Sequence, residues 1–296
     1  MQQKKQWRIV LPFLAPAVLF YSLFIVYPYL DAFRISLMDW RGVSMNMTFI
    51  GLGNFRELLG DANFWNSLKN TLFFTATNGS IVPVVALFFA VVLSKRLVWG
   101  SQFFRVVFFF PNLISVVAIS VLWSFVLNPD FGIWSNFLRL IGLESLGKVA
   151  WLGDPRTAPW CIVTVKAWAA VGFYMILYLS TLEGIPSDLY DAGRIDGTNE
   201  WQAFWHITLP LLREIMKVTV VFLLMNGFRT FAVVKIMTDG GPGRHTDTMA
   251  TYMYETGFEF SKFGYATAIA IALFLLTFVL SVLSLWMQRK KETVQY

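Results

Sequence analysis

The sequence predicts an all-α integral membrane protein organised as a single domain over residues 1–296. Three observations carry this prediction: hydrophobic residues make up 56% of the chain, charged residues make up 14%, and the chain holds 29 Phe and 12 Trp. A soluble domain is about 45–50% apolar and about 25% charged. Because a soluble core of this size cannot hide so many large rings, the chain is expected to lie in a bilayer.

A helix that crosses a membrane needs about 20 mostly apolar residues. Six stretches of the chain are long and apolar enough. The first follows Lys4, Lys5 and Arg8 and could be mistaken for a signal peptide. Its apolar run is longer than the ~7–15 residues of a signal-peptide core, so it is expected to remain as a span. The expected spans are residues 9–31, 68–93, 104–127, 157–181, 215–237 and 265–287.

Basic residues flank the first and last spans and predict their orientation. Arg289, Lys290 and Lys291 follow the last span as closely as the basic group precedes the first. Because Lys and Arg are enriched on the cytoplasmic side, both termini are expected in the cytoplasm, which requires an even number of spans. This topology places 94–103 and 182–214 in the cytoplasm, and 32–67, 128–156 and 238–264 outside.

The cytoplasmic segment 182–214 predicts two short helices joined by a tight turn. Pro186 followed by Ser187 is typical of a helix start, and Asp196 followed by Gly197 is typical of a turn or helix end. A second apolar pattern then runs to Pro210, which ends it. Such a helix pair outside the membrane suits insertion into a groove on a cytoplasmic partner.

The same segment resembles the EAA loop of bacterial ABC-importer permeases. It keeps the residues of that motif at Ala192, Asp196, Gly197, Phe204, Ile207, Leu209 and Pro210. It departs at three positions, with Asp191 for Glu and with Gly193 and Thr198 for Ala. In that family the loop forms a coupling helix that sits in a cleft of the ATPase subunit. The resemblance therefore implies contact with the ATPase through Asp191, Ala192, Gly193, Asp196, Gly197 and Thr198.

Further segments resemble carbohydrate-importer permeases of the maltose-system type. The first group is 105–112 in the third expected span, continuing to Trp123 and 128–132. The second is 239–243 with Thr248, Tyr252 and Tyr254. The third, in the first expected external loop, is 49–52 with Asn54, Phe55, Phe64 and Trp65. The resemblance covers nearly the whole chain and implies the type I ABC importer permease fold in a bacterial inner membrane. It implies a homologous second permease subunit, two ATPase subunits that carry ATP and Mg, an extracytoplasmic solute-binding protein and a saccharide substrate, besides membrane lipid.

Two cations are expected inside spans, where a charge is costly and usually faces a cavity or a partner. Lys166 and Arg229 lie near the middles of the fourth and fifth spans, and no acid within the expected spans neutralises them. One interpretation is structural, with pairing to helix-end carbonyls or to the second permease subunit. The other is that Arg229 binds an anionic substrate, because the stretch before Gly-Gly-Pro belongs to the family's sugar pocket.

The candidate substrate-binding residues under this second interpretation are Asn226, Phe228, Arg229, Thr230, Lys166, Tyr174 and Asn112. Asn and Thr suit sugar hydroxyls, and Phe suits the face of a pyranose ring. For Asn112 and Tyr174, helix packing is the favoured alternative. A neutral oligosaccharide, a uronate-type oligosaccharide and a phosphorylated polyol all remain open as substrates.

Other function classes lack the residues that they need. The single cysteine and the two histidines, expected on opposite sides of the membrane, exclude a zinc site. Residues 142–148 have the spacing of a phosphate loop, but Val149 replaces the Ser or Thr that binds magnesium. No catalytic residue, metal or cofactor is therefore expected in this chain.

An ion-coupled secondary carrier for a small polar solute is the alternative to the importer. It needs a titratable acid or histidine in the membrane, or an ion site at a broken helix. All 18 acids fall in loops, in tails or at span ends, and neither histidine falls in an expected span. A membrane-bound enzyme needs a cluster of nucleophile, base or metal ligands, which is also missing. The 24 Lys and Arg behind the net charge of +6 form no basic stripe, so no nucleic-acid partner is expected.

Overall fold

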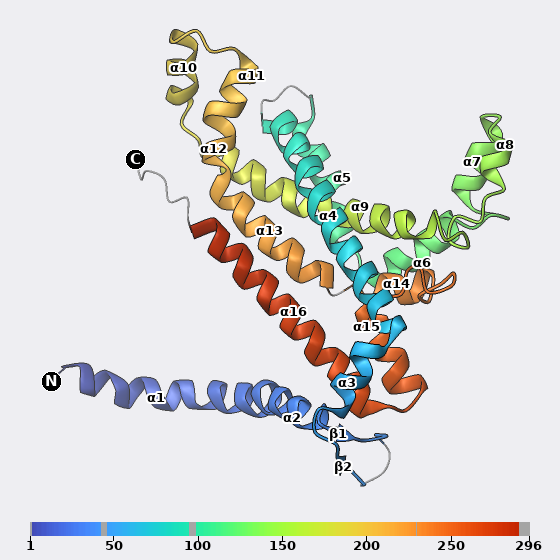
Figure 1. The fold of residues 1–296 in the computed structure, drawn as a ribbon. Helices are drawn as coiled ribbons and strands as arrows, with labels where there is room; N and C mark the ends of the chain where they lie inside the picture. The colour runs from blue at the N-terminus through green and yellow to red at the C-terminus, as the bar shows by residue number, and fades with distance from the viewer. Residues whose placement is uncertain (1, 43–45, 95–98, 229, 290–296) are drawn as a thin grey trace. The chain divides into compact units, whose positions relative to one another are not determined.

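The computed structural model describes residues 2–42, 46–94, 99–228 and 230–289, with side chains from 12 to 287. Helices dominate the described chain (Figure 1), as the composition predicts. One small sheet pairs β1 (Met38–Asp39) with β2 (Thr48–Phe49) in antiparallel fashion, with Met38 opposite Phe49. The residues form two compact units, one of residues 1–64 and 252–274 and one of residues 65–251 and 275–296.

The first unit begins with a long apolar helix that contains a short π-helical stretch. Its elements are α1 (Gln2–Tyr21), η1 (Ser22–Val26), α2 (Tyr27–Ile35), β1, β2, α3 (Gly53–Gly60) and η3 (Glu255–Glu259). None of the span Pro12–Ile35 is buried inside the protein, as suits a helix surrounded by lipid. Asn54 ties α3 to the sheet, because its side-chain amide donates hydrogen bonds to the carbonyls of Ser36 and Met38.

Three helices have residues in both units. They are α4 (Ala62–Ser94), α15 (Met249–Tyr254) and α16 (Phe263–Arg289). The remaining elements belong to the second unit: α5 (Ser101–Leu113), α6 (Val116–Val126), α7 (Ile133–Leu140), α8 (Glu144–Gly147), α9 (Ala158–Glu183), α10 (Ser187–Ile195), α11 (Glu200–Ala203), η2 (Phe204–Thr208), α12 (Leu209–Leu211), α13 (Arg213–Phe228) and α14 (Ala232–Met237).

The core of the second unit surrounds α9, whose buried residues contact α4, α5 and α13. Its largest fully buried side chains include Phe74, Met175 and Tyr178. Gly172 allows α5 to approach closely, because a β-carbon at this position would overlap the backbone of Phe108. Close approach at small residues is the usual way in which membrane helices pack.

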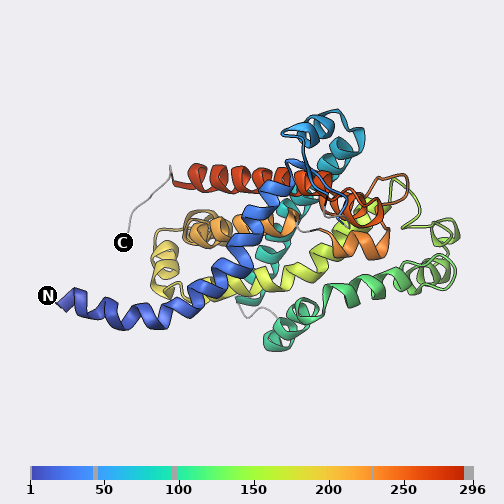
Figure 2. The ribbon, with the colours of Figure 1, turned by 90° about the horizontal axis from the view of Figure 1, so that it is seen from below.

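Both ribbon views place the short helices of the second unit at opposite ends of α9. The gold helices α10 and α11 lie near one end of α9, whereas the green helices α7 and α8 lie beyond the other end (Figure 1 and Figure 2). The expected topology, in which 94–103 and 182–214 share one side of the membrane and 128–156 lies on the other, stays a prediction.

Four helices of the described chain are long and apolar enough to span a membrane. They are Pro12–Ile35, Ala62–Ser94, Ala158–Glu183 and Phe263–Met287. They coincide with four of the six expected spans. A fifth candidate is the pair α5 and α6, if the two are counted as one broken span.

The expected spans 104–127 and 215–237 are not single straight helices. The first consists of α5 and α6, whose axes form a bend of 100° at the break between them. Ile114, at this break, has an extended backbone. Pro111 in the last turn of α5 favours such an ending, because proline restricts the backbone around it. The second consists of α13 and the short α14, and residue 229 between them lies outside the described residues. The described chain therefore supports a membrane protein with four to five candidate spans.

Candidate functional site

The segment expected to contact an ATPase folds as a helix, a tight turn and a second helix, as predicted. α10 begins directly after Pro186 and ends at Ile195. Gly197 has φ +79°, a left-handed conformation that glycine adopts without steric cost. The N–H of Thr198 donates to the carbonyl of Gly193 at 2.9 Å, which closes the helix end in the manner of a Schellman motif.

A capping box begins the next helix. The side chain of Asn199 accepts a hydrogen bond from the N–H of Gln202 at 2.8 Å, and the Gln202 side chain accepts one from the N–H of Asn199 at 2.9 Å. These bonds satisfy two backbone donors that the first turn of a helix leaves free. The turn between α10 and α11 is therefore specified by local sequence on both sides.

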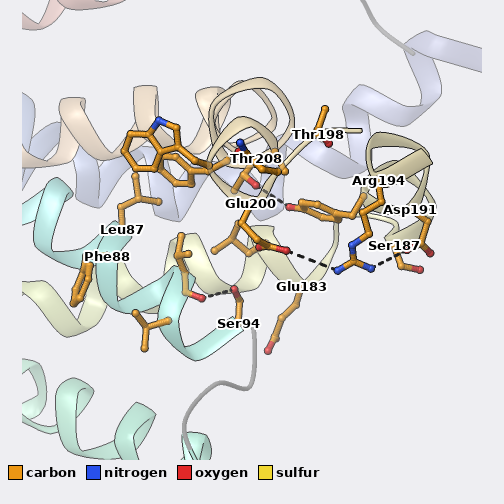
Figure 3. Close-up of a pocket in the computed structure, with 18 of the residues that line it drawn as sticks. Leu87, Phe88, Ser94, Glu183, Ser187, Asp191, Arg194, Thr198, Glu200 and Thr208 are labelled. Atoms are coloured by element: carbon orange, nitrogen blue, oxygen red, sulfur yellow. Dashed lines mark hydrogen bonds and ion pairs between the residues drawn. The ribbon is translucent and has the colours of Figure 1, made fainter. Parts of the chain in front are cut away.

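The two faces of α10 differ in what they contact. Ser187, Tyr190, Asp191 and Arg194 lie on the face that lines a cavity beside α4 (Figure 3). The rest of the helix surface, called the outer face below, does not line the cavity, and its exposed residues include Asp188, Leu189, Ala192, Ile195 and Asp196, with Ile195 exposed to 87%. The predicted coupling residues are thus divided: Ala192 and Asp196 lie on the outer face, whereas Asp191 and Thr198 line the cavity.

Gly193 is buried within the turn. A β-carbon on it would lie 2.8 Å from Thr198 Oγ1 and 3.0 Å from the end of Ile207. Tyr190 also connects the two halves of the segment, because its hydroxyl lies 3.0 Å from that of Thr208. The sequence prediction did not single out Leu189, Ile195 or Tyr190, although Leu189 and Ala192, three residues apart, have the spacing of neighbours on a helix surface.

Ion pairs on the cavity side of α10 are open to solvent. Arg194 pairs with Asp191 at 3.1 Å and approaches Glu200 at 3.9 Å, as the dashed lines in Figure 3 show. Glu183 at the end of α9 pairs with Arg105 at 2.5 Å. Exposed pairs of this kind contribute only about 0–1 kcal/mol each to stability. They orient side chains without fixing the segment rigidly.

The candidate substrate residues lie along α9 and near the end of α13, in the second unit. Lys166 donates a hydrogen bond to the hydroxyl of Thr230, whose residue is buried. Tyr174 interacts with the Asn226 side chain, and Phe228 is buried. The structure thus brings together Lys166 with Thr230 and Tyr174 with Asn226.

The other two candidates are placed differently. Asn112 is exposed, and its amide reaches the carbonyl of Ala169 at 3.5 Å, the limit of a hydrogen bond. Arg229 lies outside the described residues. Asn112 is thus placed against the backbone of α9, the helix that carries Lys166 and Tyr174.

A network of threonines and one acid holds the segment after α14; the sequence prediction named its Thr230 and Thr248 but not its acid, Asp247. Asp247 is 3% exposed and accepts from Arg244 at 2.7 Å and from Thr251 at 2.6 Å. The hydroxyl of Thr248 donates to the carbonyl of Thr230, which places the network next to the partner of Lys166. Asn70 on α4 donates to the carbonyl of Asp247 at 2.9 Å. The network thus joins α4 to the end of the α13–α14 break.

A second acid cluster lies in the first unit, where Tyr252 and Tyr265 both donate to the carboxylate of Asp61. Burial raises the pKa of Asp61, but these two hydrogen bonds and those from the N–H groups of Asn63 and Phe64 outweigh it and lower the pKa below its usual value. Asp61 is therefore held as a carboxylate that joins the start of α4 to α15 and α16.

The long apolar helices of the described chain define the class: an integral membrane protein. Residues 62–293 match the family of binding-protein-dependent transport system inner membrane components, and the chain belongs to this family. It is accordingly a multi-pass inner-membrane permease subunit of an ABC transporter, a translocation component and not the ATPase. The expected resemblance is confirmed.

Individual relatives agree with this assignment. The probable ABC transporter permease protein YurN of Bacillus subtilis (strain 168) is 38% identical over 275 residues, which cover 92% of this chain and 93% of the relative. The probable starch degradation products transport system permease protein AmyD of Thermoanaerobacterium thermosulfurigenes is 31% identical, with 95% and 94% covered. A crystal structure of a bacterial ABC transporter that imports the acidic polysaccharide alginate superposes with a TM-score of 0.86 at 22% identity, covering 99% of both chains, and this likeness shows the fold.

Proposed function

We propose that this permease passes a saccharide across the inner membrane by alternating access, driven by partner ATPase subunits. Two similarities support a saccharide: one relative is named for starch degradation products, and the structurally similar importer takes up alginate. A second similar structure is of a bacterial alginate transporter in complex with a periplasmic protein that holds an alginate pentasaccharide. In the proposal, a binding protein delivers the substrate and a homologous second permease completes the pathway. Two ATPase subunits bind ATP and Mg.

Six crossings with both termini in the cytoplasm are part of the proposal. The 16 residues of α13 extend roughly 24 Å at 1.5 Å per residue. The hydrocarbon core is about 30 Å thick, so α13 alone falls short. The six residues of α14 add roughly 9 Å. We therefore assign α13 and α14 together to one crossing with an interruption, and α5 and α6 to another.

The outer face of α10 is the proposed contact with the ATPase. The observation that carries this step is the exposure of Leu189 and Ile195 on a helix outside the candidate spans. Burying such a side chain in a partner stabilises a complex by roughly 1.5–3 kcal/mol. Asp196 and Ala192 flank these apolar residues. Asp191 faces the cavity and contributes by holding Arg194, and Gly193, Gly197 and Thr198 shape the turn.

The substrate pathway is proposed to include Asn226 and Lys166, which keep accessible surface. Thr230 and Tyr174 act through them, because Thr230 holds the Lys166 ammonium and Tyr174 holds Asn226. Phe228, which is buried, and Asn112, which contacts Ala169, are the weaker candidates. Arg229 remains a candidate on the sequence alone. A cation here suits an anionic saccharide.

The test of the coupling face is Ile195→Asp in the importer expressed with its partner subunits. A buried carboxylate in the ATPase cleft is strongly unfavourable. We expect the ATPase to be lost from the purified complex and saccharide uptake to fall by at least about tenfold.

The matched control is Leu146→Asp, an exposed leucine on α8 at the other end of α9. It makes the same apolar-to-acid change away from the proposed contact, so co-purification and uptake should stay at the level of the unmodified protein. Retention of the ATPase by the Ile195 variant would contradict the assignment of this face. Uptake that continues in cells without any ATPase subunit would instead restore the secondary carrier.

A further inference from the structure

The helix α7, together with the residue that ends it, turns an apolar face outward. Successive residues lie roughly 100° apart around a helix, so five large apolar side chains share an arc of about 120°. They are Ile133, Trp134, Phe137, Leu140 and Ile141. All five are exposed, and Leu140 is exposed to 85%. A surface helix of a soluble domain turns such a stripe toward the core, whereas this helix has the reverse arrangement.

The other side of α7 is held by the chain itself. Ser135 and Leu138 are buried, and the guanidinium of Arg139 donates to the carbonyl of Pro129 at 2.7 Å. Gly147 of α8 packs on this side, since a β-carbon on it would lie 2.6 Å from the side chain of Arg139 and 2.9 Å from the carbonyl of Ser135. These contacts fix the rotation of α7 and leave its apolar face on the outside.

The apolar face of α7 continues the exposed surface of α6. Val117, Val121 and Phe125 follow one another at four-residue steps along α6, and all three are exposed. α6 belongs to the bent pair that counts as one candidate span. The ring of Phe125 lies 6.1 Å from the ring of Phe131, which is also exposed and comes two residues before Ile133. The apolar surface of the candidate span therefore leads directly to α7.

We propose that α7 is an interfacial helix that lies along the bilayer surface, with its apolar face among the acyl chains of phospholipids. Interfacial helices bury such a face about 5–10 Å into the boundary between headgroups and acyl chains. Trp134 stacks on Phe137 with ring centroids 5.9 Å apart, and tryptophan is enriched at this boundary. α7 lies beyond the end of α9 that is opposite α10 and α11 (Figure 1 and Figure 2). Under the proposed topology it therefore contacts the outer leaflet.

A bilayer suits this face better than a soluble partner does. A binding protein that docks and leaves would expose five large apolar side chains to water in every cycle, whereas lipid covers them at all times. Residues 133–138 hold no charged side chain that could steer an encounter with a soluble protein. The continuity with α6 also places the face where a span reaches the membrane boundary.

The anchor extends to the beginning of α9. Trp134 contacts Trp151 with ring centroids 6.5 Å apart, and the carbonyl of Trp151 accepts from the hydroxyl of Thr157 at 2.6 Å. Thr157 is the residue directly before α9. A helix fixed in the bilayer surface would thus hold the first turn of α9 near that surface. The inference does not depend on which solute the importer carries.

The experiment places a photoreactive ring on the apolar face of α7 in the complete importer. Phe137→p-benzoylphenylalanine and Leu140→p-benzoylphenylalanine are each made in this chain and purified with the partner subunits and the binding protein. The complexes are irradiated in nanodiscs of phosphatidylethanolamine and phosphatidylglycerol, and the adducts are identified from the mass of the permease. We expect phospholipid adducts at both positions.

Ser145→p-benzoylphenylalanine is the matched control. Ser145 is exposed on α8 and comes two residues before Gly147, so it lies roughly 200° around that helix from the side that faces α7. The yield of lipid adduct at 137 and 140 should exceed the yield at 145 by at least about tenfold, since burying a large apolar side chain shifts an equilibrium by that much or more.

Three results would overturn the proposal: equal lipid yields at all three positions, adducts at 137 and 140 mainly with the binding protein or the second permease, and no adduct with lipid at either position. If the Phe137 variant does not assemble, the Leu140 variant still decides, because that side chain is the most exposed of the five. Uptake is not the readout, so failure of this proposal leaves the proposed function as it stands.

Discussion

Gly193 and Thr198 both depart from the alanines of the EAA motif, and the structure gives one steric reason for the two departures. The position of a β-carbon on Gly193 lies 2.8 Å from Thr198 Oγ1, closer than ordinary contact. An alanine at 193 would force Thr198 Oγ1 to move, whereas a smaller side chain at 198 would leave room for it. The two residues are therefore a matched pair.

Gly193→Ala alone should destabilise the turn by about 1–3 kcal/mol, the usual cost of overpacking. Adding Thr198→Ala should recover more than half of this loss, since it removes the nearer of the two crowding groups and leaves only Ile207. Thermal unfolding of the purified importer measures the four members of this double-mutant cycle. Additive effects of the two changes would show that the pair is not coupled.

Among the elements, α5 and α9 pack most closely, and Gly172 is the residue that permits it. A β-carbon at this position would overlap the carbonyl group of Phe108, which is backbone and cannot turn away. Gly172→Ala should therefore separate the two helices and lower the stability of the importer by at least about 2 kcal/mol, through strain and lost packing. The midpoint of thermal unfolding is the measurement.

Gly79→Ala is the matched control, because Gly79 also lies inside a long helix but has nothing within 4 Å of its β-carbon position. Alanine is the better helix former by roughly 0.8–1 kcal/mol, so this variant should unfold at the same temperature or higher. The same outcome for both glycines would mean that helix propensity, and not the contact between α5 and α9, decides the effect.

Element boundaries show what the sequence could predict and where it could not. Four spans were predictable because uninterrupted apolar runs need no knowledge of neighbouring helices, and the turn at Gly197 was predictable because its chemistry is local. The bend between α5 and α6 was not, since the sequence is apolar on both sides of Ile114 and only the backbone direction changes there. The cavity was also not predictable, because its walls on α4 and α10 are about a hundred residues apart.

For the molecule as a whole, the cation Lys166 raises the question of which group supplies its counter-charge. Within the described residues its partner is the hydroxyl of Thr230, and no carboxylate contacts it. A cation placed so is expected to find its counter-charge in the second permease or in the substrate. These two possibilities differ in what they predict for transport, because only a substrate contact makes the effect depend on substrate charge.

Lys166→Gln should reduce uptake of a uronate oligosaccharide by about tenfold more than uptake of a neutral oligosaccharide of equal length, as expected for the loss of one charge-assisted hydrogen bond. Lys217→Gln is the control: it removes a cation from α13 that is already paired with Glu214, and it should affect both substrates alike. Competition between the two saccharides in vesicles that contain the complete importer measures the ratio directly. Equal losses for both substrates in the Lys166 variant would assign the charge to contact with the second permease, and the saccharide would then be recognised without it.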